Sequence, residues 1–165
     1  MKFRPSNQAD TDRIMELIQQ AKDHLKRSGV DQWQKGYPDR ASIQADTGSQ
    51  TGYVMTDGGT VVGYLCVSFD GEEAYDHIDG AWKSIQDYAV VHRMAIDDAC
   101  KGRGLAGAMM EFAETLCALR GIHSIKVDTD MDNHAMRHIL EKNGYEYCGL
   151  IRFDNSDKIA FEKLL

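Results

Sequence analysis

The 165-residue sequence contains no run of about 18 apolar residues, so it predicts no membrane-spanning helix. Its first residues, 1–5, turn polar at once instead of beginning a signal peptide, and we expect a cytoplasmic protein. Positive charge is also scarce, because 19 lysines and arginines face 26 aspartates and glutamates, for a net charge of −7. This deficit argues against binding of nucleic acid or an anionic membrane through a broad basic surface. An anionic ligand must therefore be bound by a local group of residues.

The four cysteines are widely separated and form no Cys-x-x-Cys pair, which argues against a zinc knuckle and against a disulfide scaffold. We expect Cys66, Cys117 and Cys148 to be small core residues. The composition is ordinary for a soluble protein, with 42% hydrophobic and 27% charged residues. At this length we expect one domain that covers residues 1–165.

Hydrophobic periodicity predicts the order of the elements. An amphipathic helix is expected from Ile14 to Leu25, followed by an aromatic-rich loop and a short helix within 30–46. Later helices are expected at 104–120 and 134–143, and strands at 2–4, 53–55, 61–69, 88–96, 124–128, 145–153 and 158–163. The acidic stretch 70–87 shows no period and is expected to be a long functional or mobile loop. This order predicts an α/β (α+β) sandwich, in which helices flank a mixed, mostly antiparallel sheet beside a cleft.

The most specific motif is a glycine-rich loop between an expected strand and an expected helix. Its small residues let a ligand approach the backbone, and the helix N-terminus offers unpaired N–H groups and the positive end of the helix dipole. We therefore predict a pyrophosphate site formed by Lys101, Gly102, Arg103, Gly104, Ala106 and Gly107.

Two other phosphate loops fit this stretch less well. A Walker loop requires Gly-Lys-Ser or Gly-Lys-Thr, and neither occurs in the chain. A dinucleotide fingerprint matches Gly102, Gly104 and Gly107 in spelling, with Asp128 at a suitable distance. The loop lies late in the chain, however, and no second strand-helix-strand half follows it.

Residues 91–144 resemble the core of the GNAT superfamily of acetyl-CoA-dependent N-acetyltransferases. The family loop reads Gln/Arg-x-x-Gly-x-Gly/Ala, and here Lys101 replaces the first residue while preserving its charge. The resemblance also covers residues 93–97, Asn133 and residues 140–145, about a third of the chain. It implies a sheet with a cofactor cleft at splayed central strands, and transfer of acetyl from acetyl-CoA to a primary amine of a small molecule, a peptide or a protein, without a metal.

The resemblance assigns roles to individual positions. Met94 and Ile96 would offer backbone groups to the pantetheine arm, and the backbone N–H groups of residues 103–107 would hold the pyrophosphate. Asn133 matches an asparagine that contacts the cofactor, although an asparagine directly before a helix is equally suited to capping it.

One position departs from the family. Leu140 stands where many members have a tyrosine that protonates the leaving thiolate, so Tyr145, Tyr147 or a water would have to substitute. This departure leaves a second hypothesis open, in which the protein is a non-catalytic CoA-binding sensor or regulatory module.

His92 is the candidate general base, because it precedes Met94 by two residues on the same strand and titrates near neutrality. A structural histidine on a central strand is the alternative. The pocket for the acceptor amine would be lined by aromatic side chains, which could equally belong to the core. These are Trp33, Tyr37, Trp82 and Tyr88. The identity of the amine, the use of other acyl groups and the choice between a monomer and a homodimer are left open by the sequence.

Two apparent metal motifs are incomplete. Asp128, Asp130 and Asp132 begin like a calcium loop, but the required glycine and glutamate are replaced by Asn133 and Ile139. His134 and His138 are one helical turn apart, yet no glutamate lies between them and no third ligand is evident. We therefore expect no metal site.

Overall fold

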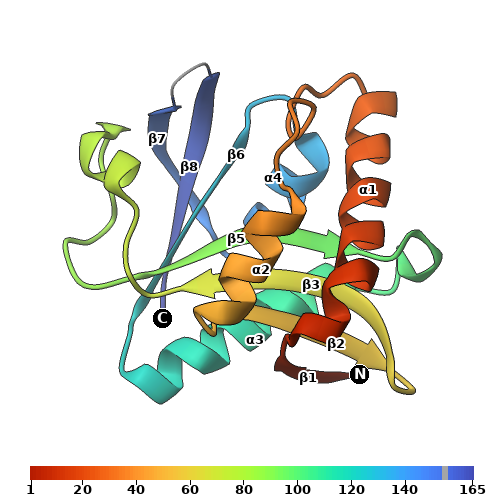
Figure 1. The fold of residues 1–165 in the computed structure, drawn as a ribbon. Helices are drawn as coiled ribbons and strands as arrows, with labels where there is room; N and C mark the ends of the chain where they lie inside the picture. Colours follow the sequence, from red (N-terminus) through yellow and green to blue (C-terminus); the bar gives the residue numbers. More distant parts are fainter. Residues whose placement is uncertain (154–155) are drawn as a thin grey trace. The chain divides into compact units, whose positions relative to one another are not determined.

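A computed structural model describes residues 1–153 and 156–165 (Figure 1). The strand order is β1-β2-β3-β5-β6-β8-β7-β4. Strands β5 and β6 pair in parallel, whereas β1–β2, β2–β3, β6–β8, β7–β8 and β4–β7 pair antiparallel. Helices flank this mixed, mostly antiparallel sheet, so the expected fold class is confirmed.

The expected helices and long strands are present, with ends shifted by a few residues. The helices are α1 Thr11–Arg27, α2 Arg40–Gly48, α3 Leu105–Arg120 and α4 His134–Lys142, with 3-10 turns η1 Gln8–Asp10, η2 Glu73–His77 and η3 Asp98–Cys100. The strands are β1 Lys2–Pro5, β2 Gly52–Asp57, β3 Thr60–Ser68, β4 Asp79–Gly80, β5 Ala89–Ile96, β6 Ser124–Asp130, β7 Glu146–Phe153 and β8 Ser156–Leu164.

The chain divides into two compact units. The first contains residues 1–67 and 92–109, and the second contains residues 68–91 and 110–165. Strand β5 and helix α3 each begin in one unit and end in the other. The single-domain expectation stays a prediction, and the two units are described separately below.

In the first unit, α1 and α2 pack on one face of the sheet. The helical spacing of Ile14, Leu17 and Ile18 puts these side chains in one fully buried stripe on α1. They share a core cluster with Ile43, Val54, Val61, Tyr64 and Ala95. Helix α2 begins where the side chain of Asp39 accepts a 2.8 Å hydrogen bond from the Ser42 N–H.

In the second unit, β7 and β8 pair antiparallel, and the other edge of β8 pairs with β6. The core of this unit contains Tyr75, Val90, Ile151 and Ala160. At the short β4–β7 pairing, Gly80 and Gly149 lie backbone to backbone. A Cβ at Gly80 would come within 2.2 Å of the Cys148 carbonyl oxygen, and one at Gly149 within 2.3 Å of the Asp79 oxygen.

The stretch 70–87 is more structured than its sequence suggests. It contains η2 and β4, and the buried side chain of Tyr75 enters the core of the second unit. The Trp82 indole N–H donates to the Tyr75 carbonyl at 2.8 Å, and the Ser84 hydroxyl donates to buried Glu162 at 2.7 Å. The segment thus contains two short elements that the sequence did not predict, and contacts with residues distant in sequence order it. Its expected functional role stays a prediction.

The expected core positions of Cys66, Cys117 and Cys148 are confirmed, and Cys100 is buried as well. In the part of the chain that the structure describes, no helix has the length and apolar character needed to span a membrane. Over the same residues, no three histidine, cysteine, aspartate or glutamate side chains gather where they could hold a metal ion.

Candidate active site

The glycine-rich loop follows β5 through a capped 3-10 turn. The Asp97 N–H donates to the Val62 carbonyl at 2.9 Å, which fixes the end of β5 against β3. The side chain of Asp97 caps η3 by accepting a 2.8 Å hydrogen bond from the Ala99 N–H. This bond and an arginine partner hold the pKa of Asp97 below its usual value.

That partner is Arg13 of α1, which sequence reasoning missed. Its guanidinium forms an ion pair with Asp97 and donates through Nε to the Val61 carbonyl at 3.0 Å. A second α1 side chain, Gln20, accepts a 2.9 Å hydrogen bond from the Asp98 N–H. Helix α1 therefore holds the entry of the loop at two consecutive residues.

Within the loop, Gly102 has φ +76° and Gly104 has φ +72°, both in the left-handed region that favours glycine. A Cβ at either position would project into open space. Helix α3 begins next, and the Ala108 N–H donates to the Gly104 carbonyl at 3.2 Å. The N–H groups of residues 105–107 form the first turn of this helix, and Ala106 and Gly107 are partly exposed there. An open, glycine-shaped backbone before a long helix suits a pyrophosphate.

The two basic side chains of the loop have acidic neighbours. Lys101 forms an ion pair with Asp98, and Arg103 forms one with Asp57 at 3.3 Å. Both cations are exposed. Exposed pairs of this kind contribute about 0–1 kcal/mol, so a bound anion could displace either carboxylate.

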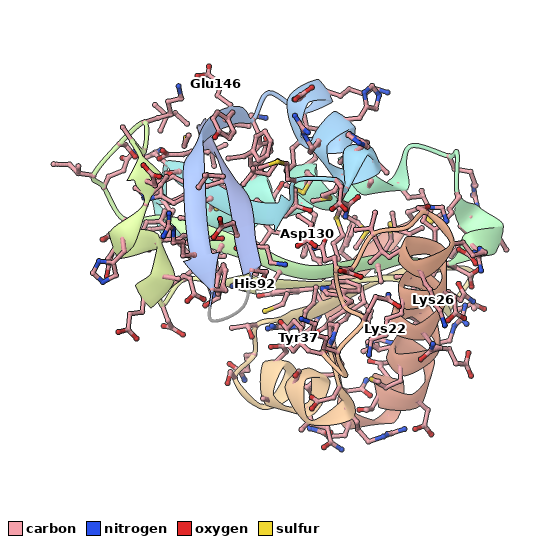
Figure 2. All side chains as sticks on the ribbon, turned by 90° about the horizontal axis from the view of Figure 1, so that it is seen from above. Lys22, Lys26, Tyr37, His92, Asp130 and Glu146 are labelled. Atoms are coloured by element: carbon pink, nitrogen blue, oxygen red, sulfur yellow. The ribbon has the colours of Figure 1, made fainter. Side chains whose placement is uncertain are left out.

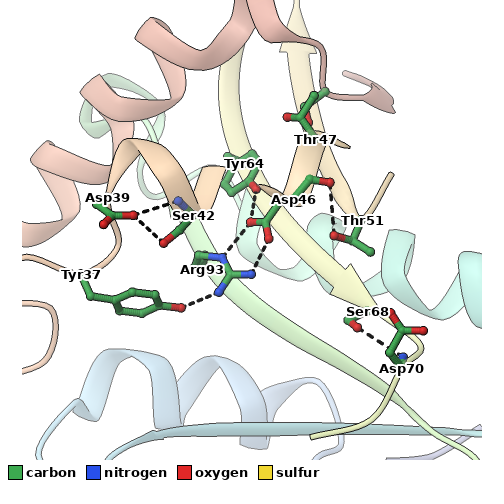
Figure 3. A network of polar contacts seen from close by, with 11 residues as sticks. Tyr37, Asp39, Ser42, Asp46, Thr47, Thr51, Tyr64, Ser68, Asp70 and Arg93 are labelled. Carbon is green, nitrogen blue, oxygen red and sulfur yellow. Dashed lines mark hydrogen bonds and ion pairs between the residues drawn. The ribbon is translucent and has the colours of Figure 1, made fainter. Parts of the chain in front are cut away.

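A buried polar network centres on Arg93 of β5 (Figure 3). Its guanidinium makes two hydrogen bonds with Asp46 of α2, from Nε at 2.8 Å and from Nη2 at 2.6 Å. Asp46, which is 6% exposed, also accepts a 2.6 Å bond from the fully buried Tyr64 hydroxyl. The third edge of the guanidinium, Nη1, donates to the hydroxyl oxygen of Tyr37. This network was also missed, since 47 residues separate Asp46 from Arg93.

Arg93 has φ +51°, a left-handed conformation that non-glycine residues adopt rarely. Strict alternation of side chains along an extended strand does not hold across such a residue. The reason given for placing His92 and Met94 on one face therefore fails locally. The role of each residue stays a prediction.

His92 is partly buried on β5 (Figure 2). Burial, followed by the nearby charge of Arg93, lowers the pKa of His92 to about 4, although Asp46 opposes this shift. The imidazole is consequently neutral at neutral pH. A neutral imidazole can accept a proton, but one with so low a pKa holds it only weakly.

The four aromatic candidates for the acceptor site fall into two groups. In the first unit, Trp33 packs against the core cluster of α1 and α2, whereas Tyr37 is 46% exposed and bonded to Arg93. In the second unit, Trp82 and Tyr88 surround the ammonium of Lys126, at 4.3 Å and 3.9 Å from their ring centres. Lys126 is 4% exposed, and burial lowers its pKa.

The positions after β6 lie in the second unit. The side-chain oxygen of Asn133 accepts a 3.1 Å bond from the Met136 N–H and so caps α4, while its contact with a cofactor stays a prediction. Leu140 is fully buried. Of the two tyrosines considered as proton donors, Tyr145 is buried with no hydrogen-bond partner for its hydroxyl among the described residues, and Tyr147 is 57% exposed.

Comparisons with known proteins agree with this geometry. Residues 15–145 match the acetyltransferase (GNAT) family. The chain is 28% identical to the uncharacterized N-acetyltransferase YesJ of Bacillus subtilis, covering 96% of this chain and 87% of that protein. A GNAT-family acetyltransferase of Streptococcus agalactiae 2603 has a crystal structure with a TM-score of 0.90 at 34% identity, covering 99% of this chain and 95% of that one.

A more distant likeness, to yncA of Salmonella typhimurium, shows the fold alone. The TM-score is 0.69 at 14% identity, over 99% of this chain and 93% of that one, and the yncA structure includes its cofactor acetyl-CoA. The match to the family model and the fold together define the class of protein, an acetyltransferase. The chain belongs to the GNAT acetyltransferase family. It is an N-acetyltransferase that uses acetyl-CoA.

Proposed function

We propose that the enzyme transfers acetyl directly from acetyl-CoA to a primary amine of a small molecule, a peptide or a protein, within a ternary complex. The amine nitrogen attacks the thioester carbonyl, a C–N bond forms, the C–S bond breaks, and the CoA thiolate leaves with the electron pair. Orientation of the two reactants supplies much of the acceleration. The single observation that carries this proposal is the open loop at Gly102 and Gly104, followed directly by the N-terminus of α3.

In this proposal the backbone N–H groups of residues 103–107 hold the pyrophosphate, and the side chains of Lys101 and Arg103 add local positive charge. Met94 and Ile96 offer backbone groups to the pantetheine arm. Strand β5 pairs with β6 at Ala89 and Val90, and both residues precede the two positions that we assign to the arm.

His92 would accept a proton from the amine, directly or through water. Its low pKa keeps the imidazole in the required neutral form. For the same reason the imidazole passes the proton on to solvent instead of keeping it. For the leaving thiolate, Tyr145 is a poor donor because burial raises the pKa of its hydroxyl far above the usual value. Exposed Tyr147 or a water is the better candidate.

The acceptor would contact Tyr37 and Trp33 in the first unit, and the sequence-based assignment of Trp82 and Tyr88 stays a prediction. We place the enzyme in the cytoplasm, where acetyl-CoA and amines are both present. The test is a panel of amines, amino acid amides and peptides incubated with acetyl-CoA, with CoA release detected by a thiol reagent. Release above background with at least one amine is expected, and cofactor binding without release across the panel would indicate a CoA-binding sensor.

A further inference from the structure

The network around Arg93 holds the hydroxyl of the partly exposed residue Tyr37. Arg93 adopts a left-handed conformation that is unfavourable for a non-glycine residue, and such a conformation persists only when its surroundings enforce it. The enforcing contact is the two-pronged pair with Asp46, whose carboxylate is also held by Tyr64. A planar guanidinium bonded in this way has little freedom to turn.

The remaining edge of the guanidinium determines the direction of the Tyr37 hydroxyl. An arginine N–H can only donate, so the Tyr37 oxygen is the acceptor in this contact. The hydroxyl hydrogen of Tyr37 must therefore be donated to a different acceptor. Tyr37 is 46% exposed, which leaves that hydrogen accessible to a ligand.

The backbone next to Tyr37 is held as well. The Lys22 ammonium donates to the Pro38 carbonyl at 2.6 Å, and the Gln34 side-chain amide donates to the Lys22 carbonyl at 2.9 Å. Helix α1 thus anchors the loop on both sides of Tyr37, and Arg93 anchors the tip of its side chain (Figure 3).

From this arrangement we infer that Asp46 and Arg93 position the Tyr37 hydroxyl to donate a hydrogen bond to a carbonyl or carboxylate oxygen of the acceptor amine. The inference rests on the proposed function, because Arg93 is the chain neighbour of His92, to which we assign the amine. It predicts a substrate class, namely amines with an oxygen acceptor close to the amino group, as in an amino acid amide or a peptide N-terminus. Neither Asp46 nor Arg93 needs to touch the substrate.

The experiment compares amines that differ in this oxygen. kcat/KM for CoA release, calculated on the concentration of the neutral amine because a neighbouring amide makes the amino group less basic, is measured with alaninamide against isopropylamine and with phenylalaninamide against phenethylamine. Alanyl-alaninamide represents a peptide. A neutral hydrogen bond contributes about 1 kcal/mol, so we expect the oxygen-bearing member to be favoured about fivefold to tenfold, mainly through KM. Tyr37→Phe should bring each ratio close to one, because phenylalanine cannot donate the hydrogen bond on which the preference depends.

Asp46→Asn should also bring the ratios close to one. Arg93→Lys should have the same effect, because lysine cannot bond Asp46 and Tyr37 with one planar group. The matched control is Asp10→Asn. Asp10 is 8% exposed and forms an equivalent pair with Arg4, with bonds of 2.7 and 2.8 Å. This control should lower the melting temperature but keep the ratios of the wild type.

The outcomes separate the two proposals. Turnover of simple amines without preference, or a preference unchanged in Tyr37→Phe, overturns this inference and leaves direct acetyl transfer standing. If Asp46→Asn does not fold, Tyr37→Phe still decides, because its exposed hydroxyl contributes little to folding. Absence of CoA release with every amine overturns the proposed function itself. Preference for alanyl-alaninamide over alaninamide would assign the site to peptides, and the reverse to small molecules.

Discussion

The hydroxyl of Tyr75 on η2 donates a 2.6 Å hydrogen bond to the carboxylate of Asp128 on β6. Burial nevertheless raises the pKa of Asp128 to about 6, and the Tyr75 bond and the charge of Lys158 only partly offset this shift. The second unit therefore holds a carboxyl group that ionises close to neutrality, at the point where the segment 70–87 contacts the sheet.

Asp128→Asn is expected to stabilise the protein at pH 7.5. The pKa of the folded state exceeds the ordinary value of 3.8, so the folded state binds more protons between pH 4 and pH 6, and stability falls as pH rises through that window. Asparagine can still accept the Tyr75 bond without a buried charge. The gain should be on the order of 2 kcal/mol at pH 7.5 and should vanish near pH 4.

Thermal melts at both pH values test this prediction. Asp76→Asn on η2, where the side chain is exposed, is the control and should leave the melting temperature unchanged. An equal difference between wild type and Asp128→Asn at pH 4 and at pH 7.5 would show that Asp128 does not titrate in this range.

Acetyl-CoA at millimolar concentration should raise the melting temperature, because a ligand that binds only the folded state stabilises it by mass action, by about 2.7 kcal/mol at a hundredfold excess over Kd. Gly104→Val should abolish this shift, since a branched side chain at φ +72° distorts the loop. Gly29→Val is the matched control, with φ +73° and open space around its Cβ. It should melt lower than wild type yet keep the ligand shift, and a normal shift in Gly104→Val would place the cofactor elsewhere.

His92→Ala should lower kcat/KM by about 10²-fold at pH 7, with partial recovery at alkaline pH, where more of the amine is free base. Because the pKa of His92 is about 4, the wild-type profile should show no limb near pH 6.5 from this residue. His24→Ala, an exposed position on α1, serves as the control. A wild-type rate and profile in His92→Ala would reduce His92 to a structural residue.

Leu140→Met should leave turnover unchanged, because the thiolate is a good leaving group whose protonation need not limit the rate. Leu140 is fully buried, and a swap that conserves volume costs less than about 1.5 kcal/mol. Leu140→Tyr places a larger, polar side chain in the core and should lower the melting temperature without raising kcat. A higher kcat in Leu140→Tyr, measured by CoA release, would instead show that proton donation limits the wild-type enzyme.

Local signals in the sequence were sufficient for much of the fold. The spacing of Ile14, Leu17 and Ile18 predicted α1, and the glycines at 102 and 104 predicted the loop before α3, because each pattern depends only on neighbours in the chain. The ion pair between Arg13 and Asp97 in the first unit could not be found in this way. Arg13 and Asp97 are 84 residues apart, and neither has a sequence context that indicates its partner.

The conformation of Arg93 shows the same limit at a single residue. Its strand is rich in β-branched and apolar residues, which predict an extended backbone, and nothing local in the sequence favours a positive φ. The ion pair with Asp46, which accompanies this conformation, can be recognised only in the folded structure. Likewise, residues 70–87 show no helical or strand period in the sequence, and they are ordered by contacts with the distant residues Asp128 and Glu162.

The contact between Gly80 and Gly149 has a consequence for how this enzyme can vary. β4 consists of two residues, and it pairs with β7 only because neither glycine has a side chain. Adding one methyl group to either would push the two backbones apart, and no compensating change in a neighbouring side chain could relieve a clash with a carbonyl oxygen. Relatives that retain this pairing should therefore vary in the surrounding aromatic side chains but keep glycine at both positions.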